Sequence, residues 1–70
     1  MMPLSMANAG EVVVIKKITG KDEVRQHLAE LGLVAEESVK IVSEVSGNLI
    51  IQVKDSRVAL DRTMANRIMI

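Results

Sequence analysis

The sequence predicts a mainly β fold, namely a small five-stranded SH3-like barrel with one α-helix inserted between strands 1 and 2. Only one segment, residues 22–31, has the apolar spacing of an amphipathic helix, and it ends at a glycine. The other segments are rich in β-branched residues and are separated by turn residues. A chain of 70 residues is expected to form one domain, residues 1–70, and closing its short sheet into a barrel limits the exposed strand edges.

The first strand is predicted over residues 11–19, after an N-terminal lead-in that holds the only proline, Pro3. Residues 12–15 are all β-branched, and such side chains favour an extended backbone. The apolar residues of this segment do not alternate strictly with polar ones. We therefore expect either burial on both faces or a bend, which a small barrel needs in order to close.

The helix is predicted to begin just after Asp22, which is placed as its N-cap because an aspartate in that position accepts hydrogen bonds from the free amides of the first turn. Three apolar residues at i, i+4 and i+7 form its buried stripe: Val24, Leu28 and Leu31. Gly32 stands where a helix end needs a left-handed residue, and Leu33 follows at the position whose side chain packs back on the last turn. This pattern predicts a Schellman stop.

Three antiparallel strands are predicted to follow, over residues 38–45, 49–54 and 57–61, and tight turns join them. Strict alternation places these residues on the inner face: Val39, Ile41, Ser43, Leu49, Ile51, Val53, Val58 and Leu60. Residues 63–66 leave room for one helical turn, and residues 68–70 form a last strand that pairs with the first. An open α+β sheet is the structural alternative.

Composition excludes several classes of function. The chain has no Cys, which rules out disulfides and thiolate metal sites, and no Phe, Tyr or Trp, so that neither a polyproline groove nor a platform for unpaired bases can be built. Nine Lys and Arg residues balance nine Asp and Glu residues and are scattered along the chain, which argues against nucleic-acid binding. A near-neutral, aliphatic protein of this size favours self-association.

A cytoplasmic location is expected, because the N-terminus has no secretory apolar segment and no apolar run approaches the roughly 18 residues that cross a bilayer. Catalysis is not expected, since the chain has one His and its Ser, Thr and carboxylate residues form no nucleophile and base arrangement. The four glycines are isolated, so no phosphate-binding loop is present. The sequence therefore predicts a non-enzymatic protein without a cofactor.

His27 is the one residue that suggests a metal site. Glu23 precedes it by four residues and Glu30 follows it by three, and imidazole with carboxylates suits ferrous iron. The same spacing is ordinary on a surface helix, where such pairs contribute about 0.2–0.5 kcal/mol each. The surface interpretation is favoured, because a metal site needs oriented partners around its ligands and the sequence shows none.

A partner-binding surface is expected at the helix end and the loop after it. Leu31, Gly32, Leu33 and Val34 bring apolar residues to a turn, although Leu31 and Leu33 are favoured as residues that seal the barrel. Val34 is the member expected to be exposed. Arg57 belongs to a charged C-terminal group that is interpreted first as solubilising and second as a docking rim.

Several short motifs occur together in a fixed order: Leu4-Ser5, Gly10-Glu11, Leu28-Ala29-Glu30-Leu31-Gly32-Leu33-Val34, Val39-Lys40-Ile41, Val58-Ala59-Leu60, Ala65 and Ile68-Met69-Ile70. In these the chain resembles the FeoA family, small cytosolic proteins associated with FeoB, the membrane GTPase that carries ferrous iron into bacteria. The resemblance implies an accessory protein that binds the cytosolic side of a FeoB-like partner and modulates ferrous-iron uptake. It implies no nucleic-acid partner and no insertion into the membrane.

The chain departs from the family pattern in one turn. After the Leu-Gly-hydrophobic step such proteins often carry Pro-Gly, where this chain has Ala35-Glu36. The same barrel also occurs as the C-terminal domain of iron-dependent transcriptional repressors. The alternative function is therefore an SH3-like regulatory domain of that type, binding a protein partner or a transition metal.

Overall fold

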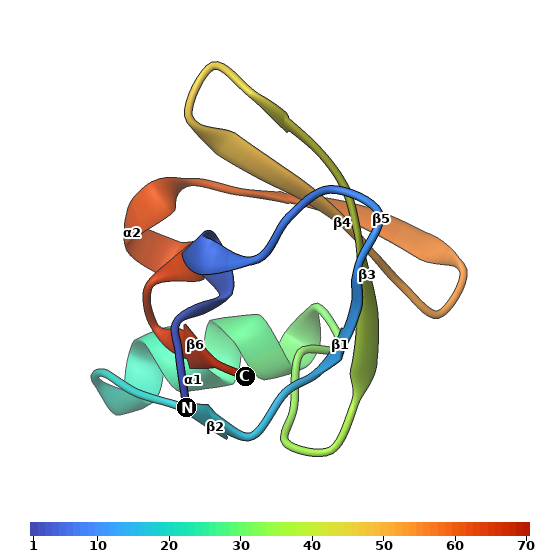
Figure 1. Cartoon of the computed structure of the whole chain (residues 1–70). Helices are drawn as coiled ribbons and strands as arrows, with labels where there is room; N and C mark the ends of the chain where they lie inside the picture. The colour runs from blue at the N-terminus through green and yellow to red at the C-terminus, as the bar shows by residue number, and fades with distance from the viewer.

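Six strands and three short helices follow one another along the chain, and the computed structural model describes all of residues 1–70 (Figure 1). In chain order they are η1 (Leu4–Met6), β1 (Val12–Val14), β2 (Lys17–Ile18), α1 (Asp22–Glu30), β3 (Ser38–Val45), β4 (Asn48–Val53), β5 (Ser56–Leu60), α2 (Arg62–Ala65) and β6 (Ile68–Met69). The element η1 is a single turn of 3₁₀-helix. The mainly β prediction is confirmed.

The strands form two open sheets. One sheet has four antiparallel strands in the order β1-β3-β4-β5, and the other pairs β2 with β6. Figure 1 shows α1 and the two-stranded sheet together on one side of the larger sheet. The prediction of one closed five-stranded barrel is therefore wrong, because the strands are divided between two sheets that are not joined edge to edge.

The predicted first strand is divided at a bend, which accounts for the two sheets. The N–H of Ile15 donates to the C=O of Glu37 at 2.9 Å, beside the larger sheet. The N–H of the next residue, Lys16, donates instead to the C=O of Met69 at 2.7 Å, beside the smaller one. Since β1 and β2 both precede α1, the helix lies between β2 and β3, which corrects its predicted place between strands 1 and 2.

The chain ends lie side by side (Figure 1). The strand β6 pairs antiparallel with β2, so the predicted pairing of the last strand with the first holds for the second half of the predicted segment. On its other side, Ile70 and Met2 exchange two backbone hydrogen bonds, of 3.0 and 2.8 Å. The N-terminal segment thus covers a strand edge that would otherwise be free.

The start of α1 differs from the prediction. Asp22 is the first helical residue, and Lys21 occupies the N-cap position without a side-chain hydrogen bond. The C=O of Lys21 already accepts from the N–H groups of Val24 and Arg25, at 3.0 and 3.1 Å. The prediction of Asp22 as N-cap is therefore wrong by one residue.

The end of α1 is the predicted Schellman stop. The N–H of Gly32 donates to the C=O of Ala29, and the N–H of Leu33 donates to the C=O of Leu28, both at 2.9 Å. Gly32 has a φ of 91°, which a residue without a Cβ adopts most readily. Leu28 and Leu33 are both fully buried, so the stop is also a contact within the core.

The core consists of aliphatic side chains alone. Its twelve buried members are Leu4, Ile15, Leu28, Leu33, Val39, Ile41, Leu49, Ile51, Val53, Leu60, Ala65 and Ile68. The predicted alternation holds along β4 but fails in β3 at Ser43, which is only half-buried. The cause is a register shift between Ile41 and Ser43, because an extra residue in one strand turns the following side chains to the other face.

Candidate docking site

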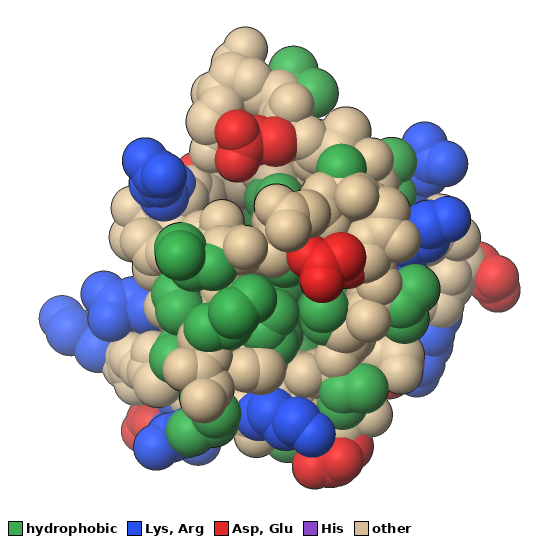
Figure 2. Space-filling view, in the orientation of Figure 1, with side chains coloured by type: hydrophobic (Ala, Val, Ile, Leu, Met, Phe, Trp, Pro, Cys, Tyr) green, Lys and Arg blue, Asp and Glu red, His purple; other side chains and the backbone are tan.

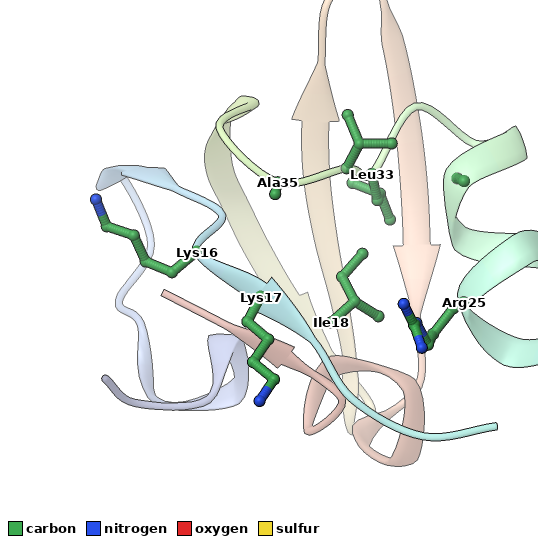
Figure 3. A pocket seen from close by; sticks show the side chains of 8 residues that line it. Lys16, Lys17, Ile18, Arg25, Leu33 and Ala35 are labelled. Atoms are coloured by element: carbon green, nitrogen blue, oxygen red, sulfur yellow. The ribbon is translucent and has the colours of Figure 1, made fainter. Parts of the chain in front are cut away.

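A pocket of about 400 Å³ lies where β2, α1 and the segment after α1 meet (Figure 3). We call it the helix-end pocket. Eight residues line it: Lys16, Lys17, Ile18, Arg25, Ala29, Leu33, Val34 and Ala35. Five are aliphatic and three are cationic, and none is acidic. The pocket thus combines an apolar wall with charge of a single sign.

The apolar wall is held by elements already described. Leu33 is fully buried and is fixed by the Schellman hydrogen bond to the last turn of α1. Ile18 is half-buried and lies in β2 opposite Ile68 of β6. Val34 is 42% exposed, so it presents an aliphatic side chain to solvent beside the buried one. This confirms the expectation that Val34 is the exposed member of the run.

The loop beyond Val34 is a tight turn at the pocket edge. The N–H of Glu37 donates to the C=O of Val34 at 3.1 Å, and Glu36, the third residue of the turn, has a φ of 75°. A positive φ at this position alone defines a type II turn, for which Pro-Gly is the favoured central pair. Ala35 and Glu36 therefore adopt the backbone conformation that Pro-Gly favours. The left-handed conformation is unfavourable at Glu36, because this residue, unlike glycine, has a Cβ.

The cations surround the pocket without converging on one point. Figure 3 shows Arg25 reaching from α1 toward Ile18, while Lys17 extends outward from β2 and Lys16 extends outward just before β2. Arg25 has an ion pair with Asp22 at 3.5 Å, and both side chains are largely exposed. The only other ion pair of the chain joins Lys54 to Glu37, so Lys16 and Lys17 have no acidic partner. The rim is therefore a local excess of positive charge.

The structure brings together two of the five predicted docking residues. Leu33 and Val34 line the helix-end pocket. Leu31 and Gly32 are half-buried and lie outside it, Leu31 packing against the core. Arg57 is exposed in β5 and is not among the lining residues.

Sequence reasoning missed most of the pocket. Ile18 and Ala29 were assigned only to their elements, and the basic residues were described as scattered. The adjacent Lys16-Lys17 pair at the end of a predicted strand was the one available signal. Nothing in the sequence indicated that Arg25, on the helix, would lie beside the same pocket.

The residues considered for metal binding do not gather. Glu23, His27 and Glu30 are all exposed on α1. No group of three or more His, Cys, Asp or Glu side chains in this chain is placed to hold a metal ion. No helix of the structure is long and apolar enough to span a bilayer.

Two further pockets lie elsewhere on the surface. A small one of about 90 Å³, the hairpin pocket, lies at the turn between β3 and β4 and is lined by Ser5, Glu44, Gly47, Leu49, Arg62 and Ala65. The hydroxyl of Ser5 donates to the side-chain oxygen of Asn66 nearby. The other, of about 370 Å³, is lined by Met2, Val13, Val14, Lys16 and Ile70. Figure 2 shows hydrophobic side chains gathered on the face over η1 and the chain ends.

Comparisons with known proteins agree with one another. Residues 2–70 match the family model described as the FeoA domain. A Methanocaldococcus jannaschii protein, provisionally named Fe(2+) transport protein A, is 34% identical over 70 residues, which are 100% of this chain and 85% of that protein. The crystal structure of Stenotrophomonas maltophilia FeoA complexed with zinc, described as a prokaryotic SH3 domain protein, is 28% identical with a TM-score of 0.85, over 99% of this chain and 88% of that one.

A manganese-dependent transcriptional repressor contains a similar fold. Its TM-score is 0.85 over 94% of this chain and 38% of the repressor chain, at 16% identity. At this identity the likeness concerns the fold alone. The Stenotrophomonas maltophilia structure, described as an SH3 domain protein, supports the SH3-like part of the predicted fold class.

Proposed function

The chain belongs to the FeoA domain family, and from this premise we propose that it is a cytosolic, non-enzymatic accessory protein that binds a FeoB-like membrane GTPase and modulates ferrous-iron uptake. Similarity to a protein named for Fe(2+) transport supports the iron-uptake part. The helix-end pocket carries the docking part, because aliphatic side chains at a concave surface can take up side chains of another protein.

The chemistry of the pocket favours binding over catalysis. Its lining residues carry no hydroxyl, thiol, imidazole or carboxylate group. A nucleophile activated by a general base is the minimum for most group-transfer reactions. The amines of Lys16 and Lys17 are exposed and extend outward, and no carboxylate or imidazole lines the pocket to activate them. An aliphatic wall with cations at its edge is therefore best suited to binding a partner protein.

The five predicted docking residues take different parts in this proposal. Val34 would contact the partner directly in the pocket, Leu33 would form the buried floor beneath it, and Leu31 and Gly32 would hold the loop in place. Arg57 remains a candidate for the rim of a larger interface that extends beyond the pocket. Self-association is proposed to use the apolar face over η1 and the chain ends.

Docking can be tested with isotope-labelled protein, the full FeoB-like transporter and its soluble GTPase domain. We expect perturbed amide signals around Leu33 and Val34, and Val34→Asp should weaken binding roughly tenfold, because a hydrated carboxylate would replace an aliphatic contact and would lose its hydration in the complex. Val45→Asp is the matched control, since Val45 is 55% exposed at the far end of β3. Unchanged spectra with both transporter samples would remove the docking proposal.

The second candidate is a regulatory domain that packs against a DNA-binding repressor domain. The observation in its favour is the shared fold of the manganese-dependent repressor, which this chain matches over 38% of the repressor's length. Gene neighbourhood separates the two candidates. A neighbouring gene for a large membrane GTPase favours docking to the transporter, and one for a winged-helix regulator favours the second candidate.

A further inference from the structure

The helix-end pocket is charged although the chain as a whole is neutral. Nine cationic and nine acidic residues give a formal net charge of zero. Three of the eight lining residues are nevertheless cationic and none is acidic, and Lys16 and Lys17 are in no ion pair. A concave surface lined by one sign of charge attracts ligands of the opposite sign. The pocket is therefore suited to an anionic ligand.

The apolar wall restricts the ligand further. Leu33 is fully buried beneath the surface, and Ala29, Val34 and Ala35 are exposed. A volume of about 400 Å³ is within the range of pockets that enclose small ligands or several side chains. The ligand must then carry an apolar group as well as negative charge, because burying the aliphatic wall under a purely ionic group would gain little.

The placement of the cations favours a ligand that carries several separate negative charges over a ligand that is one compact anion. Lys17 in β2 and Lys16 just before it extend outward, whereas Arg25 reaches across from α1 (Figure 3). These three cations can each meet a different carboxylate, but they do not point at one phosphate. No aromatic side chain exists to stack on a nucleotide base.

We propose that the helix-end pocket binds an acidic, aliphatic peptide segment of the partner. An aliphatic side chain of that segment enters the pocket beside Val34 and over the buried Leu33, and its flanking carboxylates lie near Lys17 and Arg25. The inference rests on the proposed function in so far as it takes the partner to be the transporter. Because the rim is exposed, its charges should act mainly on the association rate and on salt dependence.

The first arm of the test measures binding to the full transporter with a charge reversal and a charge neutralisation at Lys17, and with a control reversal at Lys40. Lys17→Glu should weaken binding roughly fivefold, because one attraction becomes a repulsion, and Lys17→Gln should have about half that effect in free energy. Lys40→Glu is the matched control, with the same change of charge at an exposed position in β3. Equal losses for Lys17→Glu and Lys40→Glu would overturn the inference and leave the proposed function standing.

The second arm needs no transporter. We expect a synthetic peptide of alternating Glu and Leu to shift the amide signals of Ile18, Ala29 and Val34, and these shifts should fade between about 0.05 and 0.5 M NaCl. A peptide of alternating Lys and Leu should leave them unchanged. If the acidic peptide binds there but the transporter does not, the proposed function fails and the inference holds.

The third arm addresses a lipid surface as the source of negative charge. Vesicles of phosphatidylglycerol and of phosphatidylcholine are titrated into the labelled protein beside the acidic peptide. The inference expects neither vesicle to shift the pocket signals as the peptide does. Binding to phosphatidylglycerol through Lys17, with no response to the peptide, would overturn it in favour of a membrane surface.

Discussion

The helix-end pocket and the hairpin pocket differ in both size and charge. The first has about 400 Å³ and three cations, whereas the second has about 90 Å³ and contains Glu44 together with Arg62. Both have a leucine of the core at the base, Leu33 in one and Leu49 in the other. Local grouping of charge, and not the zero net charge, therefore decides where this protein can attract a charged ligand.

The largest expected effect is the loss of stability when either of these two leucines is replaced by alanine. Leu33→Ala should lower the free energy of unfolding by about 2–5 kcal/mol, because Leu33 is fully buried and a cavity would remain. Leu49→Ala, at 5% exposure, should cost about the same by the same rule. Urea denaturation of both variants measures this. A loss below about 1 kcal/mol for Leu33→Ala would show that the wall of the helix-end pocket is not part of the core.

The second largest effect is expected when either of two glycines beside the pockets is replaced, because both have a positive φ. Gly32 and Gly47 have φ values of 91° and 82°, so replacing either with Ala should cost about 1–2 kcal/mol. A Cβ on Gly32 would meet Val53 at 3.6 Å, an ordinary contact, and one on Gly47 would meet nothing within 4 Å. Thermal unfolding should therefore give similar losses for both. A clearly larger loss at Gly32 would mean that Val53 cannot accommodate a methyl group.

The helix starts beside the two pockets differ in their caps. Asp61 caps α2 by accepting from the N–H of Met64 at 2.8 Å, and Asp61→Ala should cost about 1 kcal/mol. Lys21 has the extended N-cap backbone of α1 but makes no such bond, so Lys21→Ser should stabilise by about 0.5–1 kcal/mol. Denaturation midpoints of the two variants should move in opposite directions. Movement in the same direction would contradict the assignment of the N-cap at Lys21.

The smallest effect is expected in the turn at the edge of the helix-end pocket. Glu36→Gly should stabilise by about 0.5 kcal/mol, since relief of the left-handed conformation outweighs the greater freedom of glycine in the unfolded chain. Ser46→Gly makes the same test in the hairpin turn, where φ is 51°. Calorimetry would resolve shifts of this size. Destabilisation by Glu36→Gly would show that the glutamate side chain contributes more than the strain it causes.

The helix stop was predictable because its hydrogen bonds are local. All the groups involved, from Leu28 to Leu33, lie within six consecutive residues, and a glycine marks the left-handed position. The exposed place of Val34 followed from the same pattern. The N-cap was misplaced at Asp22 because the carboxylate was taken as decisive, whereas the backbone of Lys21 already accepts the first helical bonds.

The bend after Ile15 was expected as one of two outcomes, but its consequence was not. Neither glycine nor proline marks the point at which the chain leaves the larger sheet. The change is made by partners distant in sequence, Glu37 for Ile15 and Met69 for Lys16. Because Ile15 and Lys16 bond to different sheets, the strands form two sheets and no closed barrel. A local sequence pattern does not encode this change of hydrogen-bond partner.

Local patterns in the sequence are enough to specify the types of the elements, the aliphatic core and the stop at Gly32, because periodicity, residue size and φ preference act over a few neighbouring residues. The division of the strands between sheets and the grouping of charges on one surface emerge only when the chain folds. Lys17 and Arg25 come beside one pocket because β2 and α1 pack around Leu33. Such grouping depends on long-range contacts, and no spacing along the chain specifies them.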